Sequence, residues 1–501
     1  MGATDRPNLL VVVLDCVRAW DFPGGPDGPS GLENIEALRR ESWDFPRAAS
    51  VAHWTVPSHA TLFTGLYPWQ HGVHAKGKLA LDPSFPQIGT LLRESGYRTL
   101  SLSANGLISP TLGFTAGCDR AAWGVSLFNR VSERSVPPQG SDTKSAGSAA
   151  AEGFVRERLK SLSYWAAVYL ARYPGPWDFG TRLIHKIRRE DASAMPPRMA
   201  PWVEPTLERC LQETPADQPV YCFINLLDAH EPYLSGIDEM PGWSEWWDYA
   251  STRQDRLGWV SGEWKPTPPE LDRLHQLYRG TLELLDRRIG RIIQAFKQAG
   301  RWDDTLMILT SDHGQAFGEH QCLFHITDID EPELRIPLLL RPPRGLDQPR
   351  SAVGWASLID IVPTLLAAAG APERAGGLPG VNLFSLTDQP RGDPIYALGD
   401  GLVHAPDAAR APAERKALID RVLVGAYLNH RKVVLDPRSG EVRGFDVVND
   451  RIEGRNIAES DRAGFAPLLD GASGIGRKVL GLDESSMDAD VEDRLRSWGY
   501  I

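Results

Sequence analysis

An unbroken apolar run near the start of the chain, residues 8–14 with the sequence NLLVVVL, limits the possible folds more than any other segment. The run is rich in β-branched residues and lacks the alternation of a half-exposed strand. It therefore predicts a central strand of a parallel sheet, buried on both faces. Asp15 follows directly, and an open α/β sheet places its chemistry at the carboxyl ends of such strands.

Three further runs of this kind occur along the chain, at residues 97–103, 220–227 and 305–310, and each ends beside polar residues. Amphipathic patterns lie between them. The clearest covers residues 270–299, where apolar residues recur every three or four positions, as on one face of a helix. Strands that alternate with helices predict an α/β fold, a doubly wound and mostly parallel sheet flanked by helices.

The order of the segments predicts a large domain followed by a small one. From about residue 394, short strand-like pieces joined by turn residues predict an antiparallel sheet. We therefore expect a catalytic α/β domain over residues 1–390 and a C-terminal α+β subdomain over residues 391–501. Residues 124–205 interrupt the alternation of strand-like and helical patterns and are interpreted as an insert or lid. Its aromatic residues could cap a substrate or pack on their own domain, and its basic segment 185–189 could contact a membrane surface.

The composition disfavours several classes of protein. The net charge of −11 over 501 residues argues against a nucleic-acid binder, which needs a basic face. The five cysteines lack paired spacing, so free thiols are expected rather than a disulfide framework or a zinc ribbon. No stretch reaches the roughly 18 apolar residues that span a bilayer, and the N-terminal segment lacks the pattern of a signal peptide. A cytoplasmic enzyme without a transmembrane segment is therefore expected.

The first motif that carries chemistry is WTVPSHATLFTG, residues 54–65. It places Thr55 near the N-terminus of a helix, where unpaired backbone N–H groups and the helix dipole favour an anion. An ionised hydroxyl nucleophile and a negatively charged ester both gain from that position. The alternative is that Thr55 only caps the helix.

Two further motifs follow predicted strands. Asp312 and His313 offer one hard oxygen and one imidazole to a divalent cation, although a surface turn would also explain the pair. Asp228 and His230 follow the strand at residues 220–227. A proline two residues after His230 predicts a loop there, from which His230 can reach a pocket.

In this order, the motifs resemble the sulfatase-like branch of the alkaline-phosphatase superfamily, over about residues 7–460 without the insert. The resemblance implies a metal-dependent ester hydrolase. It also implies roles for four residues. Thr55 stands at the position of the metal-bound nucleophile, and the metal ligands correspond to Asp15, Asp312 and His313.

Two departures from the family motif bear on the chemistry. Sulfatases of the family convert a Cys or Ser nucleophile to formylglycine, and a secondary alcohol such as Thr55 cannot give that aldehyde. His59 replaces the arginine of the motif. A threonine nucleophile is similar to the phosphodiesterases and phosphoglycerol transferases of the superfamily. We therefore expect a phosphodiesterase or phosphatase that acts through a phosphothreonine. A sulfatase and a phosphoryl or phosphoglycerol-type transferase are the alternatives, and a non-enzymatic binding protein is a more distant one.

The metal ligands also depart from the family pattern. Cys16 stands where many sulfatases have a second aspartate, and the mixed oxygen and nitrogen set favours Zn or Mn over Ca or Mg. One or two ions are expected. His230, His320 and His325, with Asp228 as a further candidate, could hold a second ion that clamps the attacking and leaving oxygens.

Several histidines are candidates for the remaining roles, which are protonation of the leaving group and binding of the substrate. His325, ahead of His230, is expected to protonate the leaving alcohol unless these residues bind ester oxygens or a metal. Asn105, His59 and His230 are the candidate substrate-binding residues. The expected partner is a small-molecule phosphate or sulfate ester. The sequence identifies neither the natural substrate nor the oligomeric state.

Overall fold

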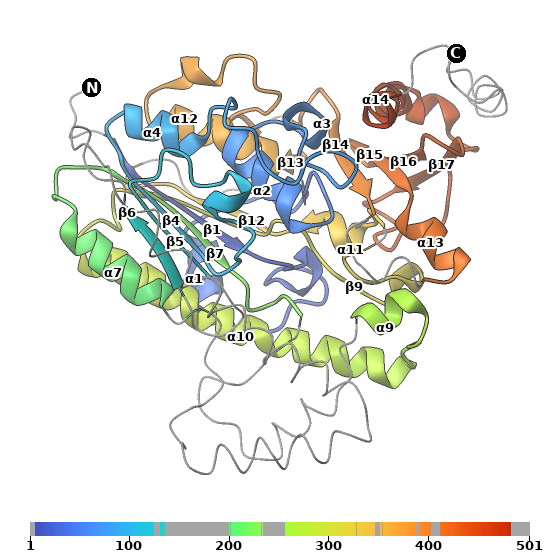
Figure 1. Cartoon of the computed structure of the whole chain (residues 1–501), viewed down its shortest axis with the longest axis horizontal. Helices are drawn as coiled ribbons and strands as arrows, with labels where there is room; N and C mark the ends of the chain where they lie inside the picture. Colours follow the sequence, from blue (N-terminus) through green and yellow to red (C-terminus); the bar gives the residue numbers. More distant parts are fainter. Residues whose placement is uncertain are drawn as a thin grey trace, which may run out of the picture.

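The computed structural model describes residues 6–124, 131–135, 200, 202–231, 233, 256–326, 328–345, 351–352, 354–386, 390–401 and 411–481. These residues form a large sheet with helices on both faces and a smaller antiparallel sheet (Figure 1). Most of the predicted insert at 124–205, including its aromatic residues and the basic segment 185–189, lies outside the described residues.

The large sheet has eight strands in the order β2-β12-β8-β1-β7-β4-β5-β6. Strands β8, β1, β7, β4 and β5 run parallel, and antiparallel strands close both edges. The four strands predicted from apolar runs are adjacent at its centre, so the predicted fold class is confirmed. They are β1 (Asn8–Leu14), β4 (Arg98–Ser103), β7 (Val220–Leu226) and β8 (Thr305–Thr310). The others are β2 (Trp43–Asp44), β5 (Arg120–Gly124), β6 (Val131–Ser135) and β12 (Leu338–Arg341).

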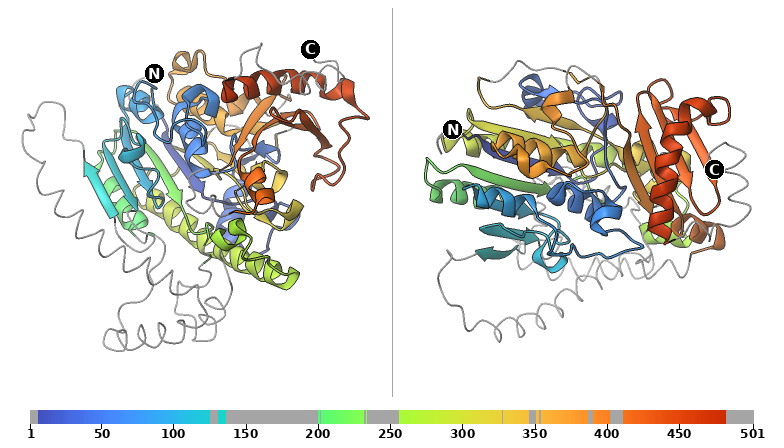
Figure 2. Two further views of the ribbon diagram at one scale, coloured as in Figure 1. Left: turned by 45° about the vertical axis from the view of Figure 1, so that its right-hand side comes forward. Right: turned by 90° about the horizontal axis from the view of Figure 1, so that it is seen from above.

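Strand β1 shows why the sheet is covered on both faces. Leu10, Val12 and Leu14 belong to one apolar core, whereas the intervening Val11 and Val13 belong to the other. The first core holds α1 (Glu33–Arg40), α7 (Val203–Glu213) and α10 (Pro268–Gln298). The second holds α2 (Thr55–Thr64), α4 (Ile88–Glu94) and α12 (Ile361–Ala368), as the two views of Figure 2 show.

The C-terminal strands form a separate four-stranded antiparallel sheet, as predicted. Alternate residues of its strand β15 face two sides. Val424 and Ala426 pack with residues of α14, whereas Leu423 and Tyr427 pack with Ile329 of the larger unit. The small sheet is therefore joined to the large unit by an apolar core. Its elements are β14 (Ile395–Asp400), α13 (Ala413–Ile419), β15 (Val422–Leu428), β16 (Arg431–Asp436), β17 (Glu441–Asp446) and α14 (Arg462–Leu480).

Helix α14 was not predicted from the sequence. Its segment contains four glycines and Pro467, which lower helix propensity. Two of these glycines serve packing, because a Cβ at Gly471 would collide with Tyr396 and a Cβ at Gly476 with Pro437. Tertiary contact with the sheet therefore outweighs local propensity here.

Several short elements complete the described chain. They are α3 (Pro68–His71), α9 (Arg256–Ser261), α11 (Glu331–Leu334), β3 (Ala48–Ala49), β9 (Ala316–Phe317), β10 (Leu323–Phe324), β11 (Arg335–Ile336) and β13 (Ala356–Ser357). Strands β9 and β10 form one small sheet, and β11, β3 and β13 form another.

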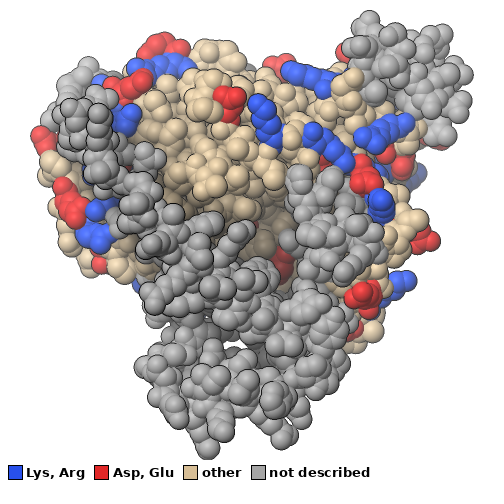
Figure 3. All heavy atoms as spheres, in the orientation of Figure 1, with Lys and Arg blue, Asp and Glu red and all other residues tan. Residues whose placement is uncertain are grey.

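The surface and the thiols agree with an ordinary globular chain. All five cysteines are free and buried. On the face shown in Figure 3, acidic and basic side chains of the described residues are interspersed. Within the described part of the chain, every helix is too short or too polar to cross a membrane.

A triad of buried charged side chains links α7 and α10 to the loop that follows β7. Arg288 on α10 donates from Nε to Glu204 Oε1 on α7 and from Nη1 to Asp228 Oδ2, both at 2.8 Å. The side chains of Arg288 and Asp228 are only 2% and 1% exposed. Each charge therefore depends on its partners for stabilisation.

We expect Arg288→Ala to lower the free energy of unfolding by about 3–5 kcal/mol, because it removes the cation from the buried Asp228 carboxylate and leaves Glu204 with Arg291, 3.5 Å away. Denaturant unfolding followed by circular dichroism measures this change. Arg287→Ala, at an exposed position on the same helix, is the control and should stay within about 0.5 kcal/mol of the wild type. Equal stabilities of the two variants would contradict the structural role of the triad.

Candidate active site

The strand register brings three of the predicted site residues to one level at the carboxyl edge of the sheet. Val13 of β1 pairs with β7 and β8, and β7 in turn pairs with β4. Two residues after these paired positions, a polar side chain follows each of three strands. These are Asp15 after β1, Asn105 after β4 and Asp312 after β8.

Ser311 joins the ends of β1 and β8. Its Oγ donates to Leu14 O and accepts from Val17 N at 2.9 Å. The backbone N–H of Cys16 donates to Asp312 Oδ1 at 3.2 Å. The loop after β1 is thus held against the loop after β8, which fixes the position of Asp15 relative to Asp312.

The Gly of the Ser-Asp-His-Gly motif allows a close backbone approach. A Cβ on Gly314 would collide with the carbonyl oxygen of Pro332. The carbonyl of Gly314 also accepts from His313 Nδ1 at 2.8 Å. This bond assigns the proton to Nδ1 and leaves Nε2 of His313 with its lone pair.

Thr55 is the first residue of α2 rather than its N-cap. Trp54 occupies the cap position with an extended backbone and makes no side-chain cap hydrogen bond. The Thr55 side chain is nearly buried, and its Oγ1 lies 3.4 Å from His313 Nε2. The capping alternative is therefore wrong, and the hydroxyl faces the Asp-His pair.

The donor atoms around His313 converge. Its Nε2 lies 3.4 Å from Asp312 Oδ2, 3.9 Å from Asp15 Oδ1 and 3.4 Å from Thr55 Oγ1. Asp312 Oδ2 is buried and has no hydrogen-bond partner among the described residues. Two carboxylates and a hydroxyl thus lie around one imidazole nitrogen, and oxygen and nitrogen donors of this kind are ones that divalent cations take. Asp15, Cys16 and His313 form a candidate metal-binding group among the described residues, and Asp312 lies beside it.

Burial strongly affects these groups. It raises the pKa of Asp312 to about 7 and lowers that of His313 to about 4. Burial and the neighbouring Asp312 also raise the pKa of Asp15. A bound cation would offset the cost of holding both carboxylates ionised, and the neutral imidazole is the form that ligates metals. The surface-turn alternative for the Asp-His pair is wrong, because both residues are fully buried.

His59 is also fully buried, one turn after Thr55 on α2. Its Nδ1 donates to Thr55 O at 2.9 Å, and its Nε2 accepts from Asn225 Nδ2 at 3.3 Å. Burial lowers its pKa to about 4, so the ring is neutral at pH 7. Because both nitrogens have protein partners, this geometry favours a positioning role over the substrate contact predicted from the sequence.

A hydrogen-bond chain continues from His59 to Asp15 across three strands. Ser103 Oγ donates to Asn105 O at 2.9 Å, lies 3.3 Å from Asn225 Oδ1, and accepts from Asn105 N at 3.1 Å. Asn105 Nδ2 then donates to Asp15 Oδ2 at 3.0 Å. Asn105 therefore orients the Asp15 carboxylate, and the chain of contacts links α2 to the predicted metal ligand.

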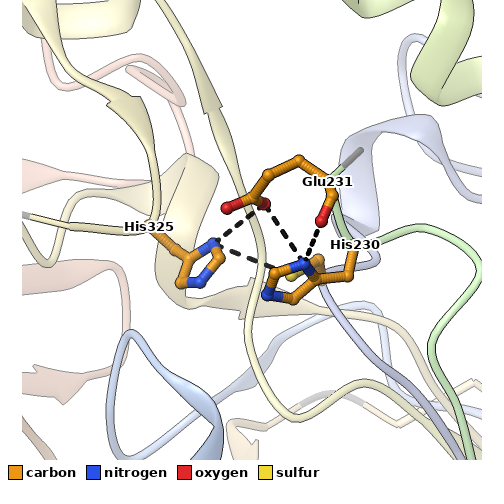
Figure 4. Close-up of side chains that lie close together, drawn as sticks. His230, Glu231 and His325 are labelled. Atoms are coloured by element: carbon orange, nitrogen blue, oxygen red, sulfur yellow. Dashed lines mark hydrogen bonds and ion pairs between the residues drawn. The ribbon is translucent and has the colours of Figure 1, made fainter. Parts of the chain in front are cut away.

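His230 and His325 lie beside this group, together with Glu231 (Figure 4). The Glu231 carboxylate Oε2 is 3.5 Å from His230 Nδ1 and 3.8 Å from His325 Nδ1. Gln315 Oε1 is 2.7 Å from His325 Nδ1, and its amide nitrogen donates to Glu231. The rings of His325 and His313 are 4.7 Å apart between centroids.

Sequence analysis did not single out Glu231 or Gln315. The sequence signal that could have found them is their position next to candidate residues, since Glu231 directly follows His230 and Gln315 ends the Asp-His-Gly-Gln run. Both are polar residues buried beside catalytic candidates. A glutamate and a glutamine on a loop are otherwise too common to be distinguished.

Two candidates for a second ion lie elsewhere. Asp228 is occupied by the Arg288 triad, and no candidate metal cluster among the described residues includes it. His320 Nε2 is 2.7 Å from Ile452 O, beside Asp330 in a different cluster. The predicted grouping of His230, His320, His325 and Asp228 is therefore wrong for Asp228 and His320, because their partners hold them at other sites.

The loop at residues 51–54, before Thr55, also contacts the C-terminal sheet. Trp54 Nε1 donates to Asp400 Oδ1 at 3.3 Å, and Leu398 N donates to Val51 O at 2.8 Å. The end of β14 thus supports the residues that lead into Thr55.

The fold and the order of the motifs along the sheet define a member of the alkaline-phosphatase superfamily. Residues 7–371 match the family model described as Sulfatase. The chain belongs to the sulfatase family and is therefore a hydrolase of that family.

Individual relatives are distant. The chain is 26% identical to the uncharacterized sulfatase YidJ of Escherichia coli (strain K12), over 77% of this chain and 72% of that protein. It is 23% identical to the choline-sulfatase of Rhizobium meliloti (strain 1021), over 92% and 84% of the two chains. The phosphonate monoester hydrolase of Agrobacterium radiobacter shares the fold with a TM-score of 0.60 at 20% identity, over 97% of both chains.

We expect Asp312→Asn and His313→Ala each to lower bound metal and turnover together, since each removes a donor from the same point. Elemental analysis of the purified protein gives the metal content, and a chromogenic ester gives the turnover. Full metal occupancy in both variants would place the ion elsewhere.

The hydrogen-bond chain predicts that Ser103→Ala lowers turnover about 10-fold or more, the usual range for groups that orient metal ligands. Ser101→Ala is the matched control on the same strand. Its hydroxyl is buried and lacks a hydrogen-bond partner among the described residues, so turnover should not change. Equal activity of the two variants would argue against a positioning role for the chain.

Proposed function

We propose that the protein hydrolyses small phosphoric esters, as a phosphodiesterase or phosphatase, with Thr55 as the nucleophile. In this proposal, a divalent cation, Zn or Mn, is held by Asp15, Asp312 and His313. The proposal rests on the buried Asp312 Oδ2, which has no hydrogen-bond partner in the described part of the chain and lies 3.4 Å from His313 Nε2, beside the Thr55 hydroxyl.

The cation, when bound, would lower the pKa of the Thr55 hydroxyl and offset negative charge on the ester. Thr55 Oγ1 attacks phosphorus as its proton passes to solvent, and the bond from phosphorus to the leaving alcohol breaks. His325 or His230 supplies the proton that the departing oxygen takes up. Water then attacks the phosphothreonine, its oxygen bonds to phosphorus and one of its protons restores the Thr55 hydroxyl, while the histidine regains a proton from solvent. The product released is phosphate or, from a diester, a phosphate monoester.

The position of Thr55 supports this chemistry in a second way. It begins a helix of 10 residues, whose N-terminal backbone N–H groups and dipole favour a bound anion. His59 holds the carbonyl of Thr55, so the first turn stays ordered while the hydroxyl faces the ester. The preorganised site would thereby stabilise charge in the transition state.

A sulfatase is the second candidate, and the family membership and the named sulfatase relatives favour it. The chemistry of Thr55 disfavours it, because a secondary alcohol cannot be converted to the aldehyde that sulfatases use. If an acceptor alcohol replaced water in the second step, the same site would act as a phosphoryl or phosphoglycerol-type transferase.

We expect Thr55→Ala to lower turnover at least about 100-fold while the fold stays intact. Thr64→Ala, on the same helix, removes a buried hydroxyl that bonds only to backbone and should keep its activity. Mass spectrometry of the peptide that contains Thr55 should show threonine or, after quenching during turnover, its phosphate adduct. Near-wild-type activity of Thr55→Ala would reject the nucleophile.

Turnover of four chromogenic esters by the purified wild-type protein distinguishes a phosphorus-ester hydrolase from a sulfatase. Its turnover of p-nitrophenyl phosphate, bis-p-nitrophenyl phosphate, p-nitrophenyl phenylphosphonate and p-nitrophenyl sulfate is compared with added Mn or Zn. The proposal requires the phosphorus esters to react faster. A clear preference for the sulfate ester would instead establish the sulfatase alternative.

A further inference from the structure

The short helix α11 lies between the large sheet and the C-terminal strands (Figure 1). On one side, its backbone holds the motif that follows β8. Gly314 N donates to Glu333 O at 2.6 Å. Gln315 N donates to Pro332 O at 2.9 Å. Because the carbonyl of Gly314 also accepts from His313 Nδ1, the position of α11 sets the position of the His313 ring.

On its other side, α11 is bonded to the C-terminal sheet through Glu331. Glu331 Oε1 accepts from the hydroxyl of Tyr427 at 2.7 Å and lies 3.4 Å from Lys432 Nζ. The backbone N–H of Glu331 donates to Glu453 Oε2 at 2.7 Å. Lys432 Nζ also donates to Ile329 O at 2.7 Å and lies 2.8 Å from Glu453 Oε1. The ammonium of Lys432 thus joins α11 and the residues just before it to strand β16.

Lys432 is both buried and charged. Its side chain is 0% exposed, as is that of Glu453, and the Glu331 side chain is 2% exposed. Burial lowers the pKa of the ammonium, but the carboxylates of Glu453 and Glu331 raise it by more, and the pKa lies above its usual value. Buried charges of this kind are stabilised only by close partners, so the ammonium and the two carboxylates hold one another in place.

The segment before α11 has further attachments to the same sheet. Asp328 Oδ1 lies 2.8 Å from Arg443 Nη2, and Asp328 Oδ2 lies 3.0 Å from Arg421 Nη2. Ile329 is buried against the sheet, where a Cβ on Gly399 would collide with its side chain. This segment should therefore stay attached to the sheet when the ammonium bonded to α11 is removed.

We propose that Lys432 is a positioning residue for the motif at residues 312–315, on which it acts through Glu331 and the backbone of α11. A displaced α11 would shift its backbone hydrogen bonds to this motif and, with them, the ring of His313. The inference rests on the proposed function, since His313 is there a metal ligand. The support that α11 gives to the motif can nevertheless be measured without metal or substrate.

Hydrogen exchange of the metal-free full-length protein, followed by mass spectrometry, tests this support, because α11 accepts from the amides of Gly314 and Gln315. The exchange rate of the peptide with these amides is compared with that of the β1 peptide, which reports unfolding of the large unit. We expect Lys432→Met to raise this ratio about 10-fold or more, since it removes the cation shared by two buried carboxylates. An unchanged ratio would overturn the proposal.

Leu469→Ala is the matched control. Leu469 is buried between α14 and the face of the C-terminal sheet opposite to α11, so this variant destabilises the same sheet without touching α11. The exchange ratio should remain at its wild-type value. An equal rise in Leu469→Ala and Lys432→Met would mean that Lys432 acts only on the stability of the sheet, and the positioning role would be rejected.

Tyr427→Phe is a milder change at the same contact. It removes one donor to Glu331 Oε1 and leaves the ammonium of Lys432 in place. The exchange ratio should rise, by a smaller factor than in Lys432→Met. If Lys432→Met does not fold, an unchanged ratio in Tyr427→Phe would still overturn the proposal.

Metal affinity connects this support to the proposed function. Binding of Mn²⁺ to the metal-free proteins, measured by competition with a chromophoric chelator, should weaken about 10-fold or more in Lys432→Met and not in Leu469→Ala. Equal affinity of the wild type and Lys432→Met would overturn the positioning role for His313. Faster exchange in Lys432→Met, in a protein whose wild type binds no metal, would keep the support by Lys432 and reject the proposed metal centre.

Discussion

The repulsion between two buried carboxylates, those of Asp15 and Asp312 at the edge of the sheet, is the main constraint on the centre of this protein. Two such groups in a medium of low polarity are costly unless a cation joins them. No lysine or arginine of the described residues forms an ion pair with either one, and His313 presents a lone pair rather than a proton. The fold brings the charges together through strand register, and the neighbouring loops supply the donors that a metal needs.

Hydrogen bonds from the scaffold keep this costly arrangement in place. Ser311 ties the ends of two strands, and Asn105 fixes one oxygen of Asp15. On the other side, His59 holds the first turn of α2. Ser311 and Asn105 follow central strands and His59 lies on α2, and all three are buried, so the site is supported by the buried centre of the large unit.

Much of this architecture could be predicted from the sequence, because its signals are local. The apolar run at β1 and the polar residues at strand ends follow from period and burial, and the positions of Asp15 and Asp312 at strand ends were predicted that way. The roles of Asp15, Asp312 and Thr55 came from the family resemblance and stay predictions. Contacts between distant segments carry no local signal. Asp228 was assigned to a metal because nothing near it in the sequence reveals Arg288, 60 residues later. Helix α14 was missed for a related reason, since its glycines serve packing against the small sheet.

The contacts between the loop before Thr55 and β14 have a consequence for biosynthesis. Residues 51–54 are supported by Leu398 and Asp400, which are made long after the strands of the large sheet. During translation, the large sheet can form on the ribosome while the loop that leads into Thr55 still lacks this support, since domains fold in order as they emerge. The nascent chain would thus lack these two contacts to the loop before Thr55 until residue 400 has left the exit tunnel.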